Sequence, residues 1–487
     1  MPVSDTYRPD AAHLALGEPF FDPVAAATFP EHRLRFRNDR WAARVGLGGL
    51  TDDEWIAHFG RFEPLPDNLP EPLALRYHGH QFRVYNPDIG DGRGFLFAQL
   101  RDDRDRLLDL GTKGSGQTPY SRSGDGRLTL KGGVREILAT EMLEALAVNT
   151  SRTFSLIETG EALQRGDEPS PTRSAVLVRL SHSHVRIGTF QRLAAHQDKA
   201  AITRLIEHCI AQYWPSAAEA EDPVEGFYRL VVGAVARMGA QWMAAGFVHG
   251  VLNTDNIAIT GESFDYGPWR FAPQVRPNMV AAYFDHGGLY SFGRQPQALE
   301  WNLARFAECL LEHAPLDRLQ AGLESFRPAF DHAFGAAVRT RLALRPSDDP
   351  EQDFELARDL FRALSETEIG FEQAFHDLLG GAMAERVAAS PHNAAYASEP
   401  MRPLVERLRD REPAAGLKAL LADPVAGAPP QTMLIDEVEA LWAAIAERDD
   451  WAPLRAKIDA VRRSGAFQAR LATACRDISP SALAARR

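Results

Sequence analysis

Asp255, Asn256 and Asp265 are the side chains in the middle of the chain that are best suited to chemistry. They lie in the stretch HGVLNTDNIAITGESFDYG, which covers residues 249–267. Asparagine and aspartate supply the oxygen ligands that Mg²⁺ prefers, and an aspartate can also act as a general base. The apolar run 257–259 predicts a short strand that holds the two polar turns apart. A solvated turn at Asp255 and a cap at Asp265 are the structural alternatives.

Asp285, in FDHGGLYSFGRQP, is a rival of Asp265 for the metal role. It lies 29 residues beyond Asn256, which is farther than one strand and one turn require. An apolar helix predicted over 227–247 would deliver the first loop against the core. That placement favours a functional loop at Asp255 over a solvated turn.

Lys113 and Glu136 have the spacing of a second candidate pair. Lys113 ends a predicted strand that begins near Arg106, and Glu136 lies 23 residues later on a predicted helix. A lysine on a strand paired with a glutamate on a helix is the device by which kinases orient nucleotide phosphates. Two unrelated surface side chains are the alternative. Glu141 and Glu144 compete for the helix position, and Glu136 is preferred because it lies in the first turns.

Two glycine-rich turns could approach a phosphate with their backbone amides. The first is NPDIGDGRG, in which Gly90, Gly92 and Gly94 precede an apolar strand and Arg93 adds a cationic donor. A glycine-rich hairpin turn is the alternative. The second turn, SGDGR at 123–127, places an acidic residue between glycines and could equally be a plain turn.

Arg179 and Arg186 lie seven residues apart around a polar turn that follows a predicted strand. In an acidic chain, two arginines that leave a strand beside the other motifs suggest an anion pocket. Exposed arginines on an edge strand are the alternative. His182 and His184 lie between them and are interpreted as turn residues, because nothing else supports a metal site there.

The elements that must position these residues change in type along the chain. Short β-type runs with glycines, and one helix over 132–148, are expected between about 75 and 190. After about 195 the pattern is mostly helical. We therefore predict an α+β, bilobal, protein-kinase-like fold with a strand-rich N-lobe, a mostly helical C-lobe and a C-terminal helical extension. The expected helices are 197–214, 224–247, 296–313, 350–380, 401–421 and 432–447. The expected divisions are an N-terminal extension over 1–70, the N-lobe over 71–195, the C-lobe with the catalytic and metal loops over 196–345 and the helical region over 346–487.

The composition favours a cytoplasmic protein that binds neither nucleic acid nor membrane. Hydrophobic residues make up 45% of the chain, charged residues make up 25%, and the net charge is −12, without the basic footprint of a nucleic-acid binder. The start, MPVSDTYRPD, has no signal-peptide pattern. The most apolar long stretch, 230–248, carries Arg237 and Gln241 and is interpreted as a buried helix. Three widely separated cysteines, Cys209, Cys309 and Cys475, predict neither a zinc site nor a disulfide framework, which suggests a reducing compartment.

The motifs occur in the order glycine loop, strand lysine, helix glutamate, catalytic loop and Asp-x-Gly. The chain resembles the selenoprotein O family, also called the YdiU family, in LGTKGSGQTPYSRSGDGR, in HGVLNTDN followed by DYGP, and in YSFGRQP. The resemblance covers most of residues 70–310. It implies a protein-kinase-like fold that binds ATP in a flipped orientation. It also implies transfer of AMP, with release of pyrophosphate, to Ser, Thr or Tyr hydroxyls of proteins, the enzyme itself included.

The resemblance also implies a role for each motif. Asp255 would be the base, Asn256 and Asp265 would hold Mg²⁺ or Mn²⁺, and Lys113 would pair with Glu136. The remaining nucleotide contacts would come from Arg179 and Arg186 at the far phosphates, and from Gly90, Gly92, Arg93, Asp125 and Gly126.

A protein or small-molecule kinase and a nucleotide-binding pseudokinase scaffold are the alternative functions. Val251 occupies the position after His249-Gly250 where small-molecule kinases of the aminoglycoside type carry aspartate, which counts against a kinase. The complete set of candidate residues counts against a scaffold. A redox role for Cys475 is not expected, because no second cysteine lies at an evident pairing position.

Overall fold

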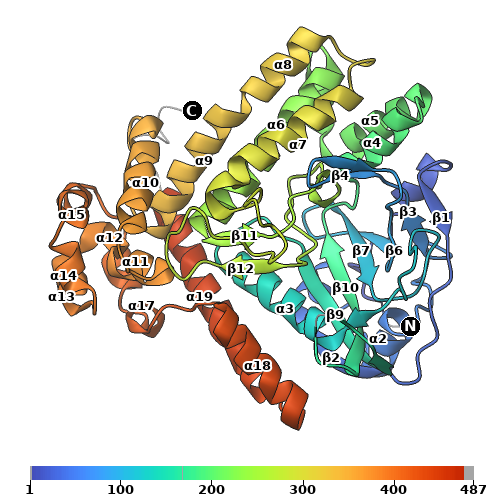
Figure 1. The fold of residues 1–487 in the computed structure, drawn as a ribbon, viewed down its shortest axis with the longest axis horizontal. Helices are drawn as coiled ribbons and strands as arrows, with labels where there is room; N and C mark the ends of the chain where they lie inside the picture. The colour runs from blue at the N-terminus through green and yellow to red at the C-terminus, as the bar shows by residue number, and fades with distance from the viewer. Residues whose placement is uncertain (1–2, 167, 477–487) are drawn as a thin grey trace.

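The strand-rich half of the chain forms one antiparallel sheet. The computed structural model describes residues 3–166 and 168–476, and in Figure 1 the strands gather on one side of the molecule and the long helices on the other. Neighbouring strands follow the order β1-β3-β6-β7-β10-β9-β2, and β8 pairs with β10. The strands are β1 (Phe21–Pro23), β2 (Arg33–Arg37), β3 (Leu73–Leu75), β6 (Leu96–Arg101), β7 (Leu107–Lys113), β8 (Leu128–Thr129), β9 (Arg152–Leu163) and β10 (Thr172–Ser181). The predicted α+β fold with two lobes is confirmed.

Helix α3 (Leu130–Ala145) lies against this sheet. Thr129 caps its first turn by accepting a hydrogen bond from the backbone of Gly132 at 3.1 Å. A side chain at Gly133 would come within 2.3 Å of Leu156 on β9, so the glycine allows close contact between helix and sheet. The helix buries Val134, Ile137, Leu138 and Met142, four of the apolar positions from which it is predicted.

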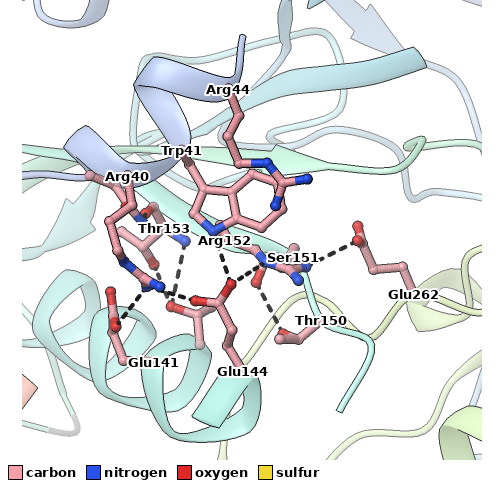
Figure 2. Close-up of polar contacts among 12 residues, drawn as sticks. Arg40, Trp41, Arg44, Glu141, Glu144, Thr150, Ser151, Arg152, Thr153 and Glu262 are labelled. Carbon is pink, nitrogen blue, oxygen red and sulfur yellow. Dashed lines mark hydrogen bonds and ion pairs between the residues drawn. The ribbon is translucent and has the colours of Figure 1, made fainter. Parts of the chain in front are cut away.

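The C-terminal half of α3 is tied to α1 (Asp39–Arg44) and to β9 by a polar network (Figure 2). Glu144 accepts hydrogen bonds from the indole of Trp41 at 2.9 Å and from Arg40 at 2.8 Å, and it lies 3.3 Å from Arg152. The guanidinium groups of Arg44 and Arg152 lie 4.3 and 4.5 Å from the centre of the Trp41 ring. These contacts fix the helix that carries Glu136.

The helical half contains more and shorter helices than the sequence predicts. The predicted helix over 350–380 ends at Ser365 and resumes at Phe371, after Gly370, and the predicted helix over 401–421 ends at Arg409, before Pro413. Gly370 and Pro413 interrupt the pattern because both residues disfavour a helix interior. The main helices are α4 (Ile187–Ala195), α5 (Lys199–Tyr213), α6 (Pro223–Ala244), α7 (Gln295–Cys309), α8 (Leu316–Glu324), α9 (Phe326–Arg341), α10 (Pro350–Ser365), α11 (Phe371–Asp377), α15 (Met401–Arg409), α18 (Ile435–Arg448) and α19 (Ala452–Arg476). Shorter helices are α2 (Asp52–Phe59), α12 (Leu379–Ala382), α13 (Ala384–Ala389), α14 (Asn393–Tyr396), α16 (Leu417–Leu420) and α17 (Pro424–Gly427).

The loop that carries Asp255 follows the buried helix α6. It leaves β11 (Phe247–His249), passes through a short 3-10 turn over Thr254–Asn256 and returns to β12 (Trp269–Phe271). The strand predicted over 257–259 is wrong, because only Ala258 forms a β-bridge, to Arg186. A turn begins at Ile259, so this apolar run is too short to form a ladder.

The last two long helices, α18 and α19, return to the front half of the chain, as Figure 1 shows. On α19, Gly465 faces Ala145 of α3, where an added side chain would come within 2.8 Å, and Arg462 pairs with Glu141 at 2.5 Å. Cys475, near the end of α19, is buried and has no disulfide partner within the described residues, as is also true of Cys209 and Cys309. In the described ranges, none of the helices combines the length and apolar character that a membrane crossing needs.

Candidate functional site

Lys113 ends β7 and meets two carboxylates. Its Nζ lies 2.5 Å from Oε1 of Glu136 on α3 and 2.8 Å from Oδ1 of Asp265. Lys113 and Glu136 are buried, and Asp265 is partly exposed. A buried ammonium group needs such carboxylates to offset the loss of water. The structure therefore brings together the predicted strand lysine and helix glutamate.

The two rival glutamates of α3 have other partners. Glu141 binds Arg462 of α19, with Oε2 2.8 Å from the Arg462 Nε, and Glu144 binds Trp41 and Arg40. Glu136 alone of the three contacts the lysine.

Asp265 contacts cations from two strands, Lys113 of β7 and Arg179 of β10. Its backbone has a left-handed φ of 60°, and its Oδ1 lies 3.4 Å from Nη1 of Arg179 as well as near Lys113. Burial opposes its ionisation, but Lys113 and then Arg179 hold the pKa of the Asp265 carboxyl well below its usual range. The residue is therefore a fixed negative charge next to the lysine.

Arg179 and Arg186 are both buried. On the paired strands β7 and β10, Arg179 lies opposite Gly111 and Leu177 lies opposite Lys113, so Arg179 and Lys113 are diagonal neighbours on one face of the sheet. β10 has partners on both sides, which excludes the edge-strand alternative for Arg179.

Arg186 immediately precedes α4 and bridges the sheet and the Asp255 loop. Its guanidinium lies over the Tyr77 ring at 4.1 Å, donates to the backbone carbonyl of Asp255 at 3.1 Å and lies 3.6 Å from the Asp91 carboxylate. Its Nη2 has no hydrogen-bond partner among the described residues although it is buried. A buried cationic nitrogen without a hydrogen-bond acceptor is suited to an anionic ligand.

His184 orients Arg179, a role that its interpretation as a turn residue missed. The ring Nε2 of His184 accepts from Nε of Arg179 at 3.2 Å, and the backbone amide of His184 donates to Asp109 at 2.7 Å. A side chain at Gly111 would come within 2.3 Å of the imidazole, so the glycine makes room for it. The sequence carries no spacing signal for this contact.

Both glycine-rich turns border one cavity of about 640 Å³, which Lys113, Arg179, Arg186 and Asp265 also line. A side chain at Gly90 would come within 2.4 Å of the Tyr120 ring, and one at Gly94 within 2.1 Å of the Thr112 carbonyl oxygen. Gly126 has a left-handed φ of 70°. The glycines are therefore required by close packing of the cavity wall. The predicted residues that line the cavity are Gly90, Gly92, Arg93, Lys113, Asp125, Gly126, Arg179, Arg186 and Asp265.

Asp125 and Arg93 lie on the outer wall of this cavity. Asp125 is paired with Arg165, whose Nη1 lies 2.8 Å from its Oδ2, and it accepts from the backbone of Arg127 at 3.0 Å. The backbone carbonyl of Arg93 accepts from Gly114, and within the described chain no ion pair engages the Arg93 guanidinium. Arg93 is therefore a cation available to a ligand.

Asp255 is not among the residues that line this cavity, but its backbone carbonyl accepts a hydrogen bond from Arg186, which does line it. Its side chain is buried, and its Oδ1 has no hydrogen-bond partner in the described chain. Burial raises the pKa of the Asp255 carboxyl to about 7, against the opposing charge of Arg186. A carboxyl group with a pKa near neutrality is suited to take up a proton.

Asn256 and Asp265 are the predicted metal ligands, and of the two only Asp265 lines the cavity. The Asn256 amide donates to the carbonyl of Val251 at 3.0 Å, which leaves its side-chain oxygen as an acceptor. Asp265 is ionised, and one carboxylate and one amide oxygen are hard ligands of the kind that Mg²⁺ and Mn²⁺ bind beside phosphate and water. Within residues 3–166 and 168–476, no cluster of three or more His, Cys, Asp or Glu side chains could hold a metal alone.

Asp285, the rival of Asp265 for the metal role, has backbone partners and is not among the residues that line the cavity. Its two carboxylate oxygens accept hydrogen bonds from the backbone amides of Leu289 and Tyr290, each at 2.8 Å. It therefore caps the turn at 285–290.

Sequence reasoning missed two further residues of the site, and only one of them carries a signal. Asp91 lies within the glycine loop, lines the cavity and accepts from the Leu75 backbone at 3.1 Å. Its position between Gly90 and Gly92 could have marked it. Tyr77, over which Arg186 lies, follows an irregular segment and has no pattern that marks it.

Comparisons with known proteins match the sequence of this chain to one family. The family model described as "Protein adenylyltransferase SelO" matches residues 4–462. A relative named "Protein nucleotidyltransferase YdiU" from Synechocystis sp. is 44% identical over 470 residues, which cover 92% of this chain and 96% of the relative. A relative of the same name from Gloeobacter violaceus is 45% identical, covering 94% and 95%, and one from Mycolicibacterium smegmatis is 39% identical, covering 72% and 74%.

Proposed function

The chain belongs to the protein adenylyltransferase SelO family, and on this premise we propose that it transfers AMP to protein hydroxyls from an ATP that binds in a flipped orientation. Adenylyl transfer with ATP as the substrate follows from the family. The proposal adds the acceptors, which are Ser, Thr or Tyr hydroxyls of proteins including the enzyme itself, the orientation of ATP and the release of pyrophosphate.

The observation that carries the proposal is the position of the buried arginines. Arg179 and Arg186 line the cavity beside Lys113, and Nη2 of Arg186 lacks an acceptor within the described chain. Such a cluster of buried cations stabilises the most highly charged part of a nucleotide, which is its β- and γ-phosphates. With those phosphates held by the arginines, the α-phosphorus faces the acceptor.

The bond changes balance for an in-line displacement. The acceptor oxygen forms a bond to the α-phosphorus, and the bond from that phosphorus to the bridging oxygen of the β-phosphate breaks, so pyrophosphate leaves. Asp255 takes the proton of the hydroxyl, which its raised pKa favours. Lys113, held by Glu136, and the two arginines stabilise the charge that develops on the leaving oxygens.

Asn256 and Asp265 would hold the divalent metal, Mg²⁺ or Mn²⁺. When bound, the metal supplies charge neutralisation at the phosphates. The ionised state of Asp265 supports this assignment, as does the free oxygen of the Asn256 amide. The roles of Gly90, Gly92, Arg93, Asp125 and Gly126 as nucleotide contacts rest on their place in the cavity wall.

The test is incubation of the protein with ATP that carries a radioactive label on either the α- or the γ-phosphate. We expect the α-label to enter protein, including the enzyme itself, and labelled pyrophosphate to appear from the γ-label. Entry of the γ-label alone would show kinase chemistry instead. Binding of ATP without transfer of either label would favour a pseudokinase.

A further inference from the structure

A second cavity, of about 560 Å³, opens beside the first and shares Arg93, Lys113, Arg127 and Arg165 with it. Its walls are the N-terminal part of α3, the segment 266–270 that leads into β12, and α18. The proposed nucleotide chemistry does not use this space. Because Lys113 lines both cavities, a ligand in the second cavity lies next to the phosphate site.

Positive charge dominates one side of this second cavity. Lys131 and Arg135 of α3 and Arg270 of β12 line it. Among the described residues, the ion pairs of this group are both with Glu439 of α18, whose Oε2 lies 2.7 Å from Lys131 and whose Oε1 lies 3.9 Å from Arg135. Arg270 donates to the backbone carbonyl of Trp269 at 3.1 Å and forms no ion pair within the described residues.

The remaining charged groups of the second cavity are largely paired with one another. Lys113 is bound by Glu136, Arg127 by Glu161 and Arg165 by Asp125. Glu168 accepts from Thr172. Burial lowers the pKa of both Arg135 and Arg270, and in Arg135 the charge of Arg270 adds to that effect. The three cations around Glu439 therefore carry an excess of positive charge in a chain whose net charge is −12.

Exposed aromatic side chains connect this cation group to the Asp255 loop. Tyr283 and Phe284 line the second cavity, and 81% and 41% of their surfaces are exposed. The Phe284 ring lies 5.8 Å from the Phe82 ring, at the tip of the hairpin of β4 (Gly79–Gln81) and β5 (Val84–Asn86). The backbone amide of Phe82 donates to Asn253 at 3.1 Å, two residues before Asp255. Exposed aromatic groups next to a charged cavity are typical of a protein-binding surface.

We propose that this surface, from Lys131, Arg135 and Arg270 across Tyr283 and Phe284 to Phe82, binds acidic segments of the acceptor proteins. The proposal rests on the proposed transfer to proteins and names the substrate class: hydroxyls next to aspartate or glutamate and an apolar residue. Acidic side chains contact the cations, and the apolar side chain packs on the exposed rings. Glu439 occupies part of the same charge site from within the chain, so it competes with the acidic segment.

The test measures binding of two fluorescein-labelled peptides to the full-length protein by anisotropy, without ATP. Both peptides carry one serine, one phenylalanine and a run of aspartates, and in the second peptide asparagines replace the aspartates. We expect the acidic peptide to bind at least about tenfold more tightly at low salt, and the difference to shrink as salt rises. Equal binding of the two peptides would overturn the proposal.

Two variants should change this binding in opposite directions. Arg270→Ala is expected to weaken binding of the acidic peptide about three- to tenfold and to leave the neutral peptide unchanged, because only a charge contact is lost. Glu439→Gln is expected to strengthen binding of the acidic peptide, a gain that misfolding cannot produce. Arg455→Ala removes an exposed arginine of α19 that does not line the cavity and is the matched control.

The binding measurements test the docking surface separately from the proposed transfer of AMP. Unchanged binding of the acidic peptide in Arg270→Ala, or in Glu439→Gln, would overturn the docking surface. Because no nucleotide is present, a failure of α-label transfer leaves this binding result intact. If both peptides bind equally well and AMP is transferred equally well to both, the proposed adenylyl transfer is supported and the proposed docking surface is contradicted.

Discussion

Asp265 shows how single residues define the site, because it lies within 3.4 Å of two cations, Lys113 and Arg179. Replacement by alanine leaves Lys113 with Glu136 alone and removes the proposed anionic metal ligand. We expect Asp265→Ala to lower the rate of AMP transfer at least about a hundredfold while the protein stays folded. The measurement is incorporation of α-label at saturating Mg²⁺ or Mn²⁺, with thermal melting as the check on folding.

Asp285→Ala is the matched control for this prediction. It removes an aspartate that caps the turn at Leu289 and Tyr290, so we expect a lower melting temperature and no change in the metal concentration that gives half-maximal transfer. Near-normal transfer by Asp265→Ala at saturating metal would contradict the ligand role of Asp265.

Arg186 can distinguish the flipped orientation of ATP from the orientation that ATP has in a conventional kinase. In the flipped orientation its buried guanidinium contacts phosphates that AMP lacks. A charge-assisted contact contributes roughly 1.5–3 kcal/mol, so Arg186→Ala should weaken ATP binding about 10- to 100-fold and leave AMP binding almost unchanged. Calorimetry with both nucleotides measures this. Equal losses for ATP and AMP would mean that Arg186 supports the loop of Asp255, to which it also donates a hydrogen bond.

At the scale of elements, the position of Glu136 depends on how α3 is held. The helix is bound at its C-terminal half by α1 and β9, and α19 adds an ion pair from Arg462 to the buried Glu141. Removal of one partner of a largely buried pair leaves a charge without compensation. The C-terminal helices therefore help to position a residue of the site that lies more than 300 positions earlier in the chain.

Arg462→Ala is expected to lower the free energy of unfolding by about 2 kcal/mol, because Glu141 then keeps only a 3.4 Å contact to Arg40. The measurement is urea unfolding. Arg455→Ala, an exposed arginine of the same helix, should change the free energy by less than about 0.5 kcal/mol. The double variant with Glu141→Gln should cost less than the sum of the single changes. Additive costs would show that the pair is not coupled.

At the scale of the whole molecule, buried histidines couple folding to pH. Burial lowers the pKa of His13, His78 and His182 from 6.5 to about 4. Below pH 6.5 the unfolded chain takes up protons that the folded chain does not, so stability is lost as pH falls from about 6.5 towards 4. All three residues lie in the strand-rich half of the chain.

We therefore expect the free energy of unfolding to fall between pH 7 and pH 5, before most carboxylates titrate. His13→Asn should reduce the difference between the two pH values, whatever its effect on stability at pH 7. Urea unfolding at both pH values measures this. If the free energy of unfolding falls by the same amount between pH 7 and pH 5 in His13→Asn as in the unmodified protein, His13 does not contribute to the pH dependence.

The sequence by itself determined the elements and motifs whose signal is local. The glycine turns, the strand that ends at Lys113 and the helix that carries Glu136 follow from short-range patterns, and the division into a strand-rich and a helical half follows from the change of hydrophobic period. Tertiary structure decided which charges meet. The place of β10 between β7 and β9 put Arg179 inside the sheet and not on an edge strand, backbone amides engaged the Asp285 carboxylate, and α19 came to lie against α3. These outcomes depend on distances between residues that are remote in the sequence, and in an eight-stranded sheet such distances are set by strand order, which no local pattern encodes.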